Sequence, residues 1–143
     1  MKNGYMGEPS LVITVPTASG DLSGQAFQNG TFNGTLVKDA STVSPYNAPV
    51  EVSTDKAVKH YVSNALTYNA AVEATWAAID IGDKVYYDGS ALKDDPGHTG
   101  KKIRLTMSPL DKTGATNVQF GIAASKTTTA TAAVEEIYVI PVR

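Results

Sequence analysis

Apolar and polar residues alternate along much of the chain with the two-residue period of half-buried β-strands. In the run 11–15, Leu11, Ile13 and Val15 fall on one face, and Pro16 ends the strand because proline has no N–H to donate to a ladder. The same alternation recurs at 79–87, 103–107 and 118–124. Further short strands are expected at 25–27, 35–38, 49–53 and 136–142.

Two Asn-Gly pairs lie close together near the first strands. Asn29-Gly30 and Asn33-Gly34 both supply the positive-φ residues that tight hairpin turns prefer. Because they are too close for both to close long hairpins, we expect one turn and one kink or bulge. Farther along, the Thr/Ala-rich run 126–133 is predicted to be a flexible hairpin loop.

The region 54–78 is ambiguous between helix and strand. Thr54 is a suitable N-cap, and apolar residues follow it at helical spacing. The stretch 60–68 also has the composition of a strand. Both interpretations stay open, so the predicted fold includes one short helix here as an option.

Short strands at this spacing, without a long βαβ rhythm, predict an all-β fold: a small single-domain barrel or sandwich. A chain of 143 residues is long enough for one core. We expect residues 1–9 to form a flexible N-terminal arm and residues 10–143 to form the single β-rich domain.

Composition excludes several classes of function. A formal net charge of -2 provides no basic field for a phosphate backbone, so nucleic-acid binding is not expected. The absence of cysteine excludes disulfides and thiolate zinc sites. No apolar run resembles a signal peptide or a membrane span, so we expect no membrane partner and synthesis in the cytoplasm.

The sequence offers little for catalysis or for metal binding. His60 and His98 are the only histidines, and they lack the spacing of a ligand pair. No Ser lies in a Gly-x-Ser-x-Gly motif. We therefore expect no enzyme activity, no cofactor and no metal. Turn-forming roles are expected for the aspartates, which lack calcium-loop spacing: Asp80, Asp83, Asp88, Asp94 and Asp95.

Three segments together resemble the capsid cement or decoration proteins of tailed phages, a family long catalogued as a domain of unknown function. The first runs from Leu11-Val12-Ile13-Thr14-Val15-Pro16 to Ser23-Gly24-Gln25-Ala26-Phe27. The second is Ile81-Gly82-Asp83-Lys84-Val85-Tyr86-Tyr87-Asp88, similar to a recurrent G-D-x-V-Y-W/Y-D segment of that family. The third is Phe120-Gly121-Ile122-Ala123 with its small-residue loop and apolar final strand. The chain departs from the family pattern at 56–75, which is longer than the usual connection.

The resemblance implies a β-rich virion subunit that binds the outer surface of the major capsid protein lattice and stabilises the head. It also implies a homo-oligomer, a trimer before a dimer, with closed symmetry. Two alternatives stay open. One is a tail or baseplate structural β domain, and the other is a carbohydrate-binding host-attachment module that uses Trp76 and the tyrosines.

Aromatic and apolar residues near two strands are the interface candidates. Tyr86 and Tyr87 must point to opposite faces; Tyr87 shares its face with Ile81 and Val85, so we assign Tyr87 to the core and Tyr86 to an interface. Trp76 is also assigned to the core. The last strand is apolar on both faces, so it is either central or covered by another subunit. The complete set of interface candidates is Tyr86, Tyr138, Ile137, Val139 and, in the N-terminal arm, Tyr5.

Overall fold

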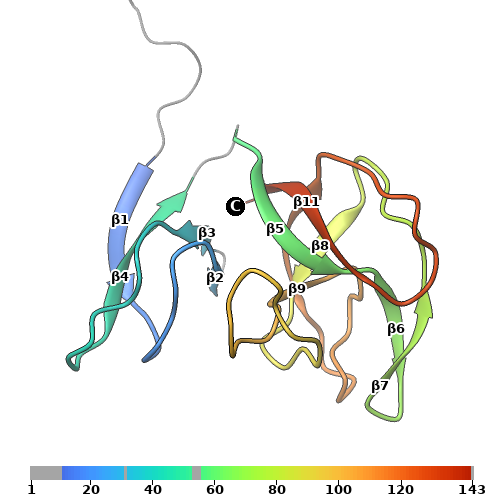
Figure 1. Cartoon of the computed structure of the whole chain (residues 1–143), viewed down its shortest axis with the longest axis horizontal. Coiled ribbons are helices and arrows are strands. Elements are labelled where there is room, and N and C mark those ends of the chain that lie inside the picture. The colour runs from blue at the N-terminus through green and yellow to red at the C-terminus, as the bar shows by residue number, and fades with distance from the viewer. Residues whose placement is uncertain (1–10, 31, 53–55, 143) are drawn as a thin grey trace, which may run out of the picture.

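The computed structural model describes residues 11–30, 32–52 and 56–142. Within them the chain forms eleven β-strands and no helix, which confirms the predicted all-β fold (Figure 1). None of the described residues belongs to a helix that could cross a bilayer. The strands are β1 (Leu11–Pro16), β2 (Ala26–Asn29), β3 (Phe32–Leu36), β4 (Asn47–Val52), β5 (Val58–Ser63), β6 (Ala65–Asn69), β7 (Val72–Trp76), β8 (Lys84–Tyr87), β9 (Leu105–Thr106), β10 (Val118–Ala123) and β11 (Val134–Pro141).

The first four strands form an antiparallel sheet in the order β1-β4-β3-β2, here called the N-terminal sheet. β1 pairs with β4 from Leu11 opposite Val52 to Pro16 opposite Asn47. The apolar face predicted for 11–15 therefore lies next to the apolar face of β4 in the sheet. A small core gathers on this face, made of Phe27, Leu36, Ala40, Ala48 and Val50.

The remaining strands form a closed five-stranded barrel in the order β10-β11-β5-β9-β8, with the hairpin β6–β7 beside it. All its pairs are antiparallel except β5 with β9. Closing the sheet leaves its five strands without a free edge. Its core consists of Ala26, Val62, Ile79, Val85, Leu105, Met107, Phe120, Ala123, Ile137 and Val139.

The described part of 54–78 forms the strands β5, β6 and β7 with short connections and no helix, so the helical alternative is wrong. In β5, His60 and Val62 are buried while Lys59 and Tyr61 are not, which is a two-residue period. β5 lies between β11 and β9, and its pairing with both decides the local conformation over the helical spacing. Tertiary pairing has overridden a weak local preference.

The predicted regular alternation of 118–124 is wrong, because a bulge interrupts β10 between Gln119 and Gly121. The bulge turns Phe120 and Ala123 into the core and leaves Val118 44% exposed. Gly121 permits the close approach of β11, since an added Cβ would collide with the carbonyl oxygen of Ile140.

The two Asn-Gly pairs differ in their roles. Asn29-Gly30 closes the β2–β3 hairpin, with Gly30 at a φ of 63°. Asn33-Gly34 lies inside β3 in regular register, so the expected kink or bulge is absent there. Gly34 is needed for packing, because an added Cβ would lie 2.5 Å from Cγ1 of Val50.

The loop 126–133 is anchored by Asn64, which is fully buried. The Asn64 side-chain amide donates to the carbonyl oxygens of Thr129 and Thr131, and its Oδ1 accepts from the N–H of Ala133. The low-complexity run predicted as a flexible loop is thus tied to the end of β5 by three hydrogen bonds from one side chain.

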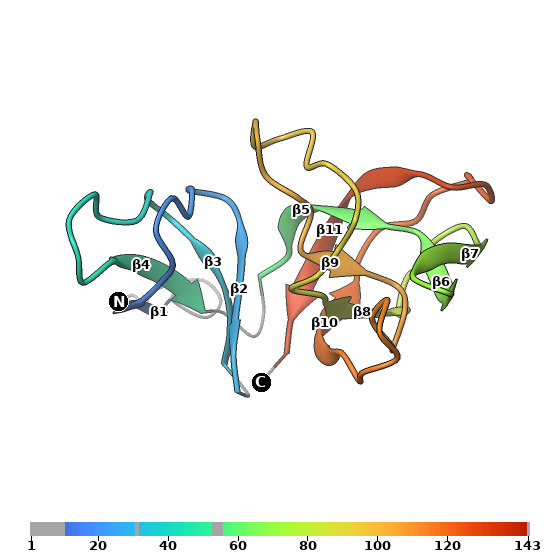
Figure 2. The ribbon, with the colours of Figure 1, turned by 90° about the horizontal axis from the view of Figure 1, so that it is seen from below.

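The N-terminal sheet and the barrel lie side by side and share buried contacts (Figure 2). Ala26 of β2 is part of the barrel core. The amide of buried Asn33 donates to the carbonyl oxygens of Gln119 and Val142, at 3.2 and 2.7 Å. These contacts join segments that are far apart in the sequence into one compact domain.

Candidate functional site

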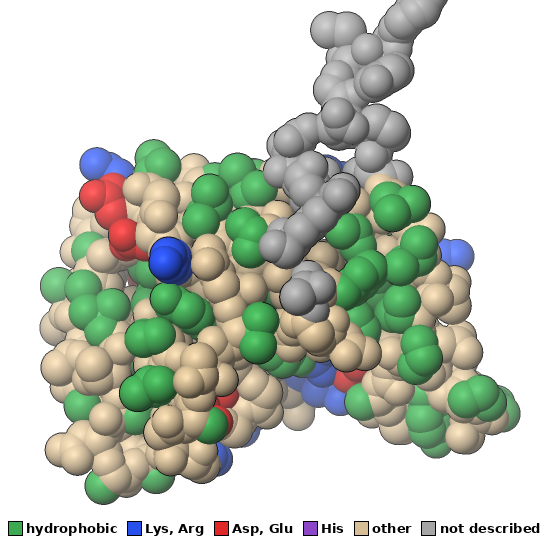
Figure 3. Space-filling model, turned by 180° about the vertical axis from the view of Figure 1, so that it is seen from behind, with side chains coloured by type: hydrophobic (Ala, Val, Ile, Leu, Met, Phe, Trp, Pro, Cys, Tyr) green, Lys and Arg blue, Asp and Glu red, His purple; other side chains and the backbone are tan. Residues whose placement is uncertain are grey.

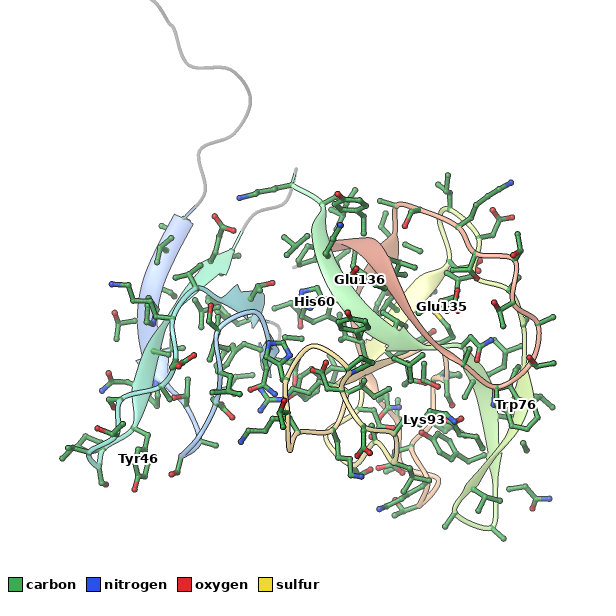
Figure 4. The ribbon with its side chains drawn as sticks, viewed as in Figure 1. Tyr46, His60, Trp76, Lys93, Glu135 and Glu136 are labelled. Carbon is green, nitrogen blue, oxygen red and sulfur yellow. The ribbon has the colours of Figure 1, made fainter. Side chains whose placement is uncertain are left out.

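A pocket of about 250 Å³ lies where the N-terminal sheet meets the barrel, and both histidines line it. It is called the junction pocket below. Figure 4 shows His60 on β5, between the barrel and the N-terminal sheet. The pocket is lined by Gly24, Gln25, Ala26, Lys59, His60, Tyr61, Asp95, Gly97, His98, Arg104, Leu105 and Glu136.

His98 contacts a hydrogen-bond acceptor with each of its ring nitrogens. Nδ1 lies 2.7 Å from Oδ2 of Asp95, and Nε2 lies 2.7 Å from the carbonyl oxygen of Ser23. The other oxygen of Asp95 accepts from the N–H of Gly97, which orients the carboxylate. His98 therefore connects the 89–102 loop of the barrel to the 17–25 loop of the N-terminal sheet.

His60 makes a second contact between the two parts. Its Nε2 lies 2.9 Å from the hydroxyl of Thr35 on β3, and its ring packs edge-on against Phe120, with centroids 5.5 Å apart. Burial lowers the pKa of His60 to about 4; Asp95 opposes this change and His98 adds to it. His60 is therefore a neutral core residue at pH 7.

Arg104 makes a third contact. Its guanidinium donates to Oδ1 of Asp21 at 2.6 Å and to the carbonyl oxygen of Ala26 at 3.0 Å. Beside it, buried Gln25 accepts from the N–H of Leu22 through Oε1, but its Nε2 has no partner among the described residues. The lining of the junction pocket thus includes one buried donor, Nε2 of Gln25, without a hydrogen-bond partner among the described residues.

The geometry argues for a connecting role of these residues. A His–Asp pair acts as a general base when its second ring nitrogen faces a nucleophile. In His98 that nitrogen faces the carbonyl oxygen of Ser23, and in His60 the Nε2 faces a buried Thr35 hydroxyl. Both imidazoles are already used to hold the N-terminal sheet against the barrel.

The predicted interface candidates differ in how far their side chains are exposed. Ile137 and Val139 are 2% and 0% exposed inside the barrel, so a neighbouring subunit cannot reach them without opening it. β11 is therefore a central strand, one of the two alternatives foreseen. Tyr138 on its outer face is 45% exposed, and Tyr86 is half-buried. Tyr5 and the arm 1–9 lie outside the described residues.

Of the two aromatic residues assigned to the core, Tyr87 is placed correctly and Trp76 is not. Tyr87 packs against the barrel core as predicted, and burial raises its pKa while Arg104 opposes the change. Trp76 belongs to neither core cluster, so its assignment to the core is wrong. It lies half-buried on β7, and its Nε1 donates to Oε1 of Glu73 at 3.2 Å (Figure 4).

Several aspartates have the turn-forming roles expected from the sequence. Oδ2 of Asp83 accepts from the N–H of Asp80, and Asp88 accepts from Ser90. Two further aspartates contact other side chains: Asp94 forms an ion pair with Lys102, and Asp95 contacts the imidazole of His98. Among the described residues no three His, Asp or Glu side chains group as metal ligands.

One face of the molecule carries few charged groups. In Figure 3, hydrophobic side chains gather on the right-hand side, over the N-terminal sheet, with Lys, Arg, Asp and Glu sparse among them. Strand β1 contributes no charge, and Leu11 and Val12 on its two faces are 56% and 48% exposed. β1 is also an edge of its sheet, since β4 is its one partner among the described strands.

No protein-family model, curated protein or solved structure matches the chain. Sequence reasoning missed the junction pocket because its contacts join distant residues: His98 is 75 positions from Ser23, and Arg104 is 83 positions from Asp21. No local spacing signals such pairs. The one hint in the sequence was the rarity of histidine, since both copies meet at this pocket.

Proposed function

We propose that this protein is a virion structural protein: a capsid cement or decoration subunit that binds the outside of the major capsid protein lattice of a tailed phage. The observation that carries the proposal is the three-segment resemblance, together with where those segments lie. The second and third segments supply β8, β10 and β11, which are consecutive strands of the barrel. The first supplies β1 and β2, and its Ala26 enters the barrel core.

The surface supports a role in packing against other proteins. The exposed apolar residues of β1 and the sparse charge over the N-terminal sheet cost little to desolvate on contact (Figure 3). A subunit that covers such a surface by binding an assembled shell stabilises that shell by mass action. Bridging two capsomers buries area on both and opposes their separation.

Self-association is part of the proposal, as a homotrimer before a dimer. Tyr138 is the best placed of the interface candidates, because it is exposed on the barrel and lies under the ammonium of Lys59, 5.5 Å from the ring centroid. Sedimentation equilibrium gives the mass of the assembly. A Tyr138→Ala variant that stays folded and weakens the assembly supports this contact, and an unchanged mass removes Tyr138 from it.

The deciding experiment adds the purified protein to tailed particles of the parent phage that lack it, followed by sedimentation and cryo-microscopy, and probes a glycan array with the same protein. We expect saturable binding and regular density on the outer face of the shell. Density confined to the tail or baseplate would replace the proposal with that alternative. Absence of binding to either structure would contradict it. Glycan binding without particle binding would favour a host-attachment module.

A further inference from the structure

His98 forms a clasp between the two parts of the molecule, and both ring nitrogens contribute to it. Each nitrogen lies 2.7 Å from an oxygen that only accepts hydrogen bonds at neutral pH: the Asp95 carboxylate and the Ser23 carbonyl. A neutral imidazole has one N–H and one lone pair, so it satisfies only one of them. An imidazolium has two N–H groups and satisfies both.

We propose that His98 is a proton-dependent clasp, which as the imidazolium ion joins the 95–101 turn of the barrel to the N-terminal sheet and which loosens when the proton is lost. In the neutral ring, a nitrogen lone pair faces an oxygen lone pair at one of the two contacts. That contact then opens or turns away. Protonation and closure of the clasp therefore favour each other.

The barrel side of the clasp is a turn that holds itself together. The N–H of His98 donates to the carbonyl oxygen of Asp95, that of Lys101 to His98, and that of Asp95 to Lys101. Gly97 packs so closely on Tyr61 that an added Cβ would lie 2.7 Å from its ring. The imidazole is thus presented from a fixed position, and its contacts do not depend on ordering a free loop.

The opposite side is fixed as well. The N–H of Ser23 donates to Oδ1 of Asp39, and the N–H of Gly24 donates to the carbonyl oxygen of Leu36 on β3. These bonds hold the Ser23 carbonyl in place. The next residue, Gly24, has a φ of 90°, and an added Cβ would lie 3.1 Å from Nε2 of His98.

Among the described residues, Asp95 is the one charged side chain in direct contact with His98. The other charged groups around the clasp are paired or belong to other parts of the pocket lining. Arg104 is paired with Asp21, and His60 is neutral at pH 7. The remaining neighbours are Asp39 behind Ser23, Lys101 beside Gly20, and Lys59 and Glu136 on the pocket wall.

The test is an NMR titration of the whole protein from about pH 5 to about pH 9, observing imidazole nitrogens and backbone amides. Only two histidines are present, so the ring signals are assigned by comparison with a His98→Gln variant. We expect both ring nitrogens of His98 to be protonated at the acidic end. As one loses its proton, the amides of Ser23, Gly24 and Gly97 should shift with the same midpoint.

Variants separate the clasp from a general effect of pH. In His98→Gln the common step of these amides should disappear, because a glutamine amide does not titrate in this range. Lys102→Gln, at an exposed position on the same loop, is the matched control and should leave the step unchanged.

Two results would overturn the proposal. One is a His98 ring that has a single N–H at about pH 5 while the protein is folded. The other is amide signals on both sides of the clasp that stay constant while the ring titrates. If His98→Gln does not fold, the unmodified protein alone decides, with its ring signals assigned from a His60→Gln variant. Constant amide signals on both sides of the clasp while the ring titrates would still overturn the proposal.

Discussion

The barrel and the N-terminal sheet are stabilised in different ways. The barrel closes on itself around a core of ten buried residues. The sheet is open and has five buried core residues on one face. Its other face presents Asn33 and Thr35 to the barrel, and both are buried and hydrogen-bonded there. The sheet therefore relies on the barrel to satisfy its polar groups, whereas the barrel core is mostly its own.

Because of this difference, we expect the stability of the N-terminal sheet to depend on the barrel more than the stability of the barrel depends on the sheet. Without the barrel, the sheet loses the partners of Asn33 and Thr35 and keeps its own core of five residues, which buries too little apolar surface to hold four strands. Loosening the sheet exposes one residue of the barrel core, Ala26. We expect the sheet to open before the barrel does.

The largest effect is expected in the barrel core. Phe120 is fully buried and touches His60, so Phe120→Ala should lower the free energy of unfolding by about 4 kcal/mol through lost burial and a cavity. The matched change in the sheet, Leu36→Ala, should cost about 3 kcal/mol. Urea unfolding measures both, and a clearly larger loss from Leu36→Ala would contradict the ranking.

The second effect depends on pH and arises from His60. Its pKa is about 4 in the folded protein and 6.5 in the unfolded reference, so the unfolded chain binds more protons between these values. Stability is therefore retained above pH 6.5 and is lost as the pH falls toward 4, by about 3 kcal/mol in total.

Urea unfolding at several pH values measures this loss. A His98→Gln background removes the other imidazole, and adding His60→Gln should then flatten the acid side of the profile. An acid slope that is the same with and without His60 would show that its burial is not the cause.

The third effect arises where the two parts meet, because Arg104 lies in the barrel but donates to the sheet. Arg104→Met keeps much of the side-chain packing and loses the bonds to Asp21 and Ala26, so we expect a loss of about 2 kcal/mol. Hydrogen exchange should accelerate in β2 and β3 more than in β10 and β11. Lys102→Met, next to β9 but exposed, is the control and should change little. Equal acceleration in both parts would contradict the proposed dependence.

The smallest effect concerns the β6–β7 hairpin, which lies outside both cores. Ala70 and Ala71 occupy its tip with φ values of 49° and 68°, a conformation that favours Asn and Gly. The double change Ala70→Asn with Ala71→Gly should raise the free energy of unfolding by about 1 kcal/mol. Thermal unfolding measures it, and a loss of stability would show that this turn is held by contacts to alanine.

Sequence patterns predicted the strands best where one face is buried and the partner is close. The alternation at 11–15 and the Asn29-Gly30 turn both match the structure, because an amphipathic strand and a positive-φ turn are local properties. The alternation at 118–124 did not, because the bulge between Gln119 and Gly121 arises in the pairing of β10 with β8, a strand distant in sequence. The sequence alone leaves β5 open between helix and strand, because pairing with β11 and β9 decides its conformation.

The junction pocket could not have been predicted from one sequence. Its bonds connect the 17–25 loop, β3, β5 and the 89–102 loop, and none of these pairs has a characteristic spacing. Tyr87 was placed correctly because it shares its face with Val85, which is a local rule. Trp76 was misplaced because its hairpin projects away from the barrel core, which only the tertiary fold decides.

We propose that this protein acts by holding a capsid shell together. The most direct test is the temperature at which heads of the parent phage release their DNA, followed with a DNA-binding dye, with and without the purified protein. We expect a higher release temperature that saturates as the sites on the shell fill. An unchanged release temperature on heads that have bound the protein would contradict it.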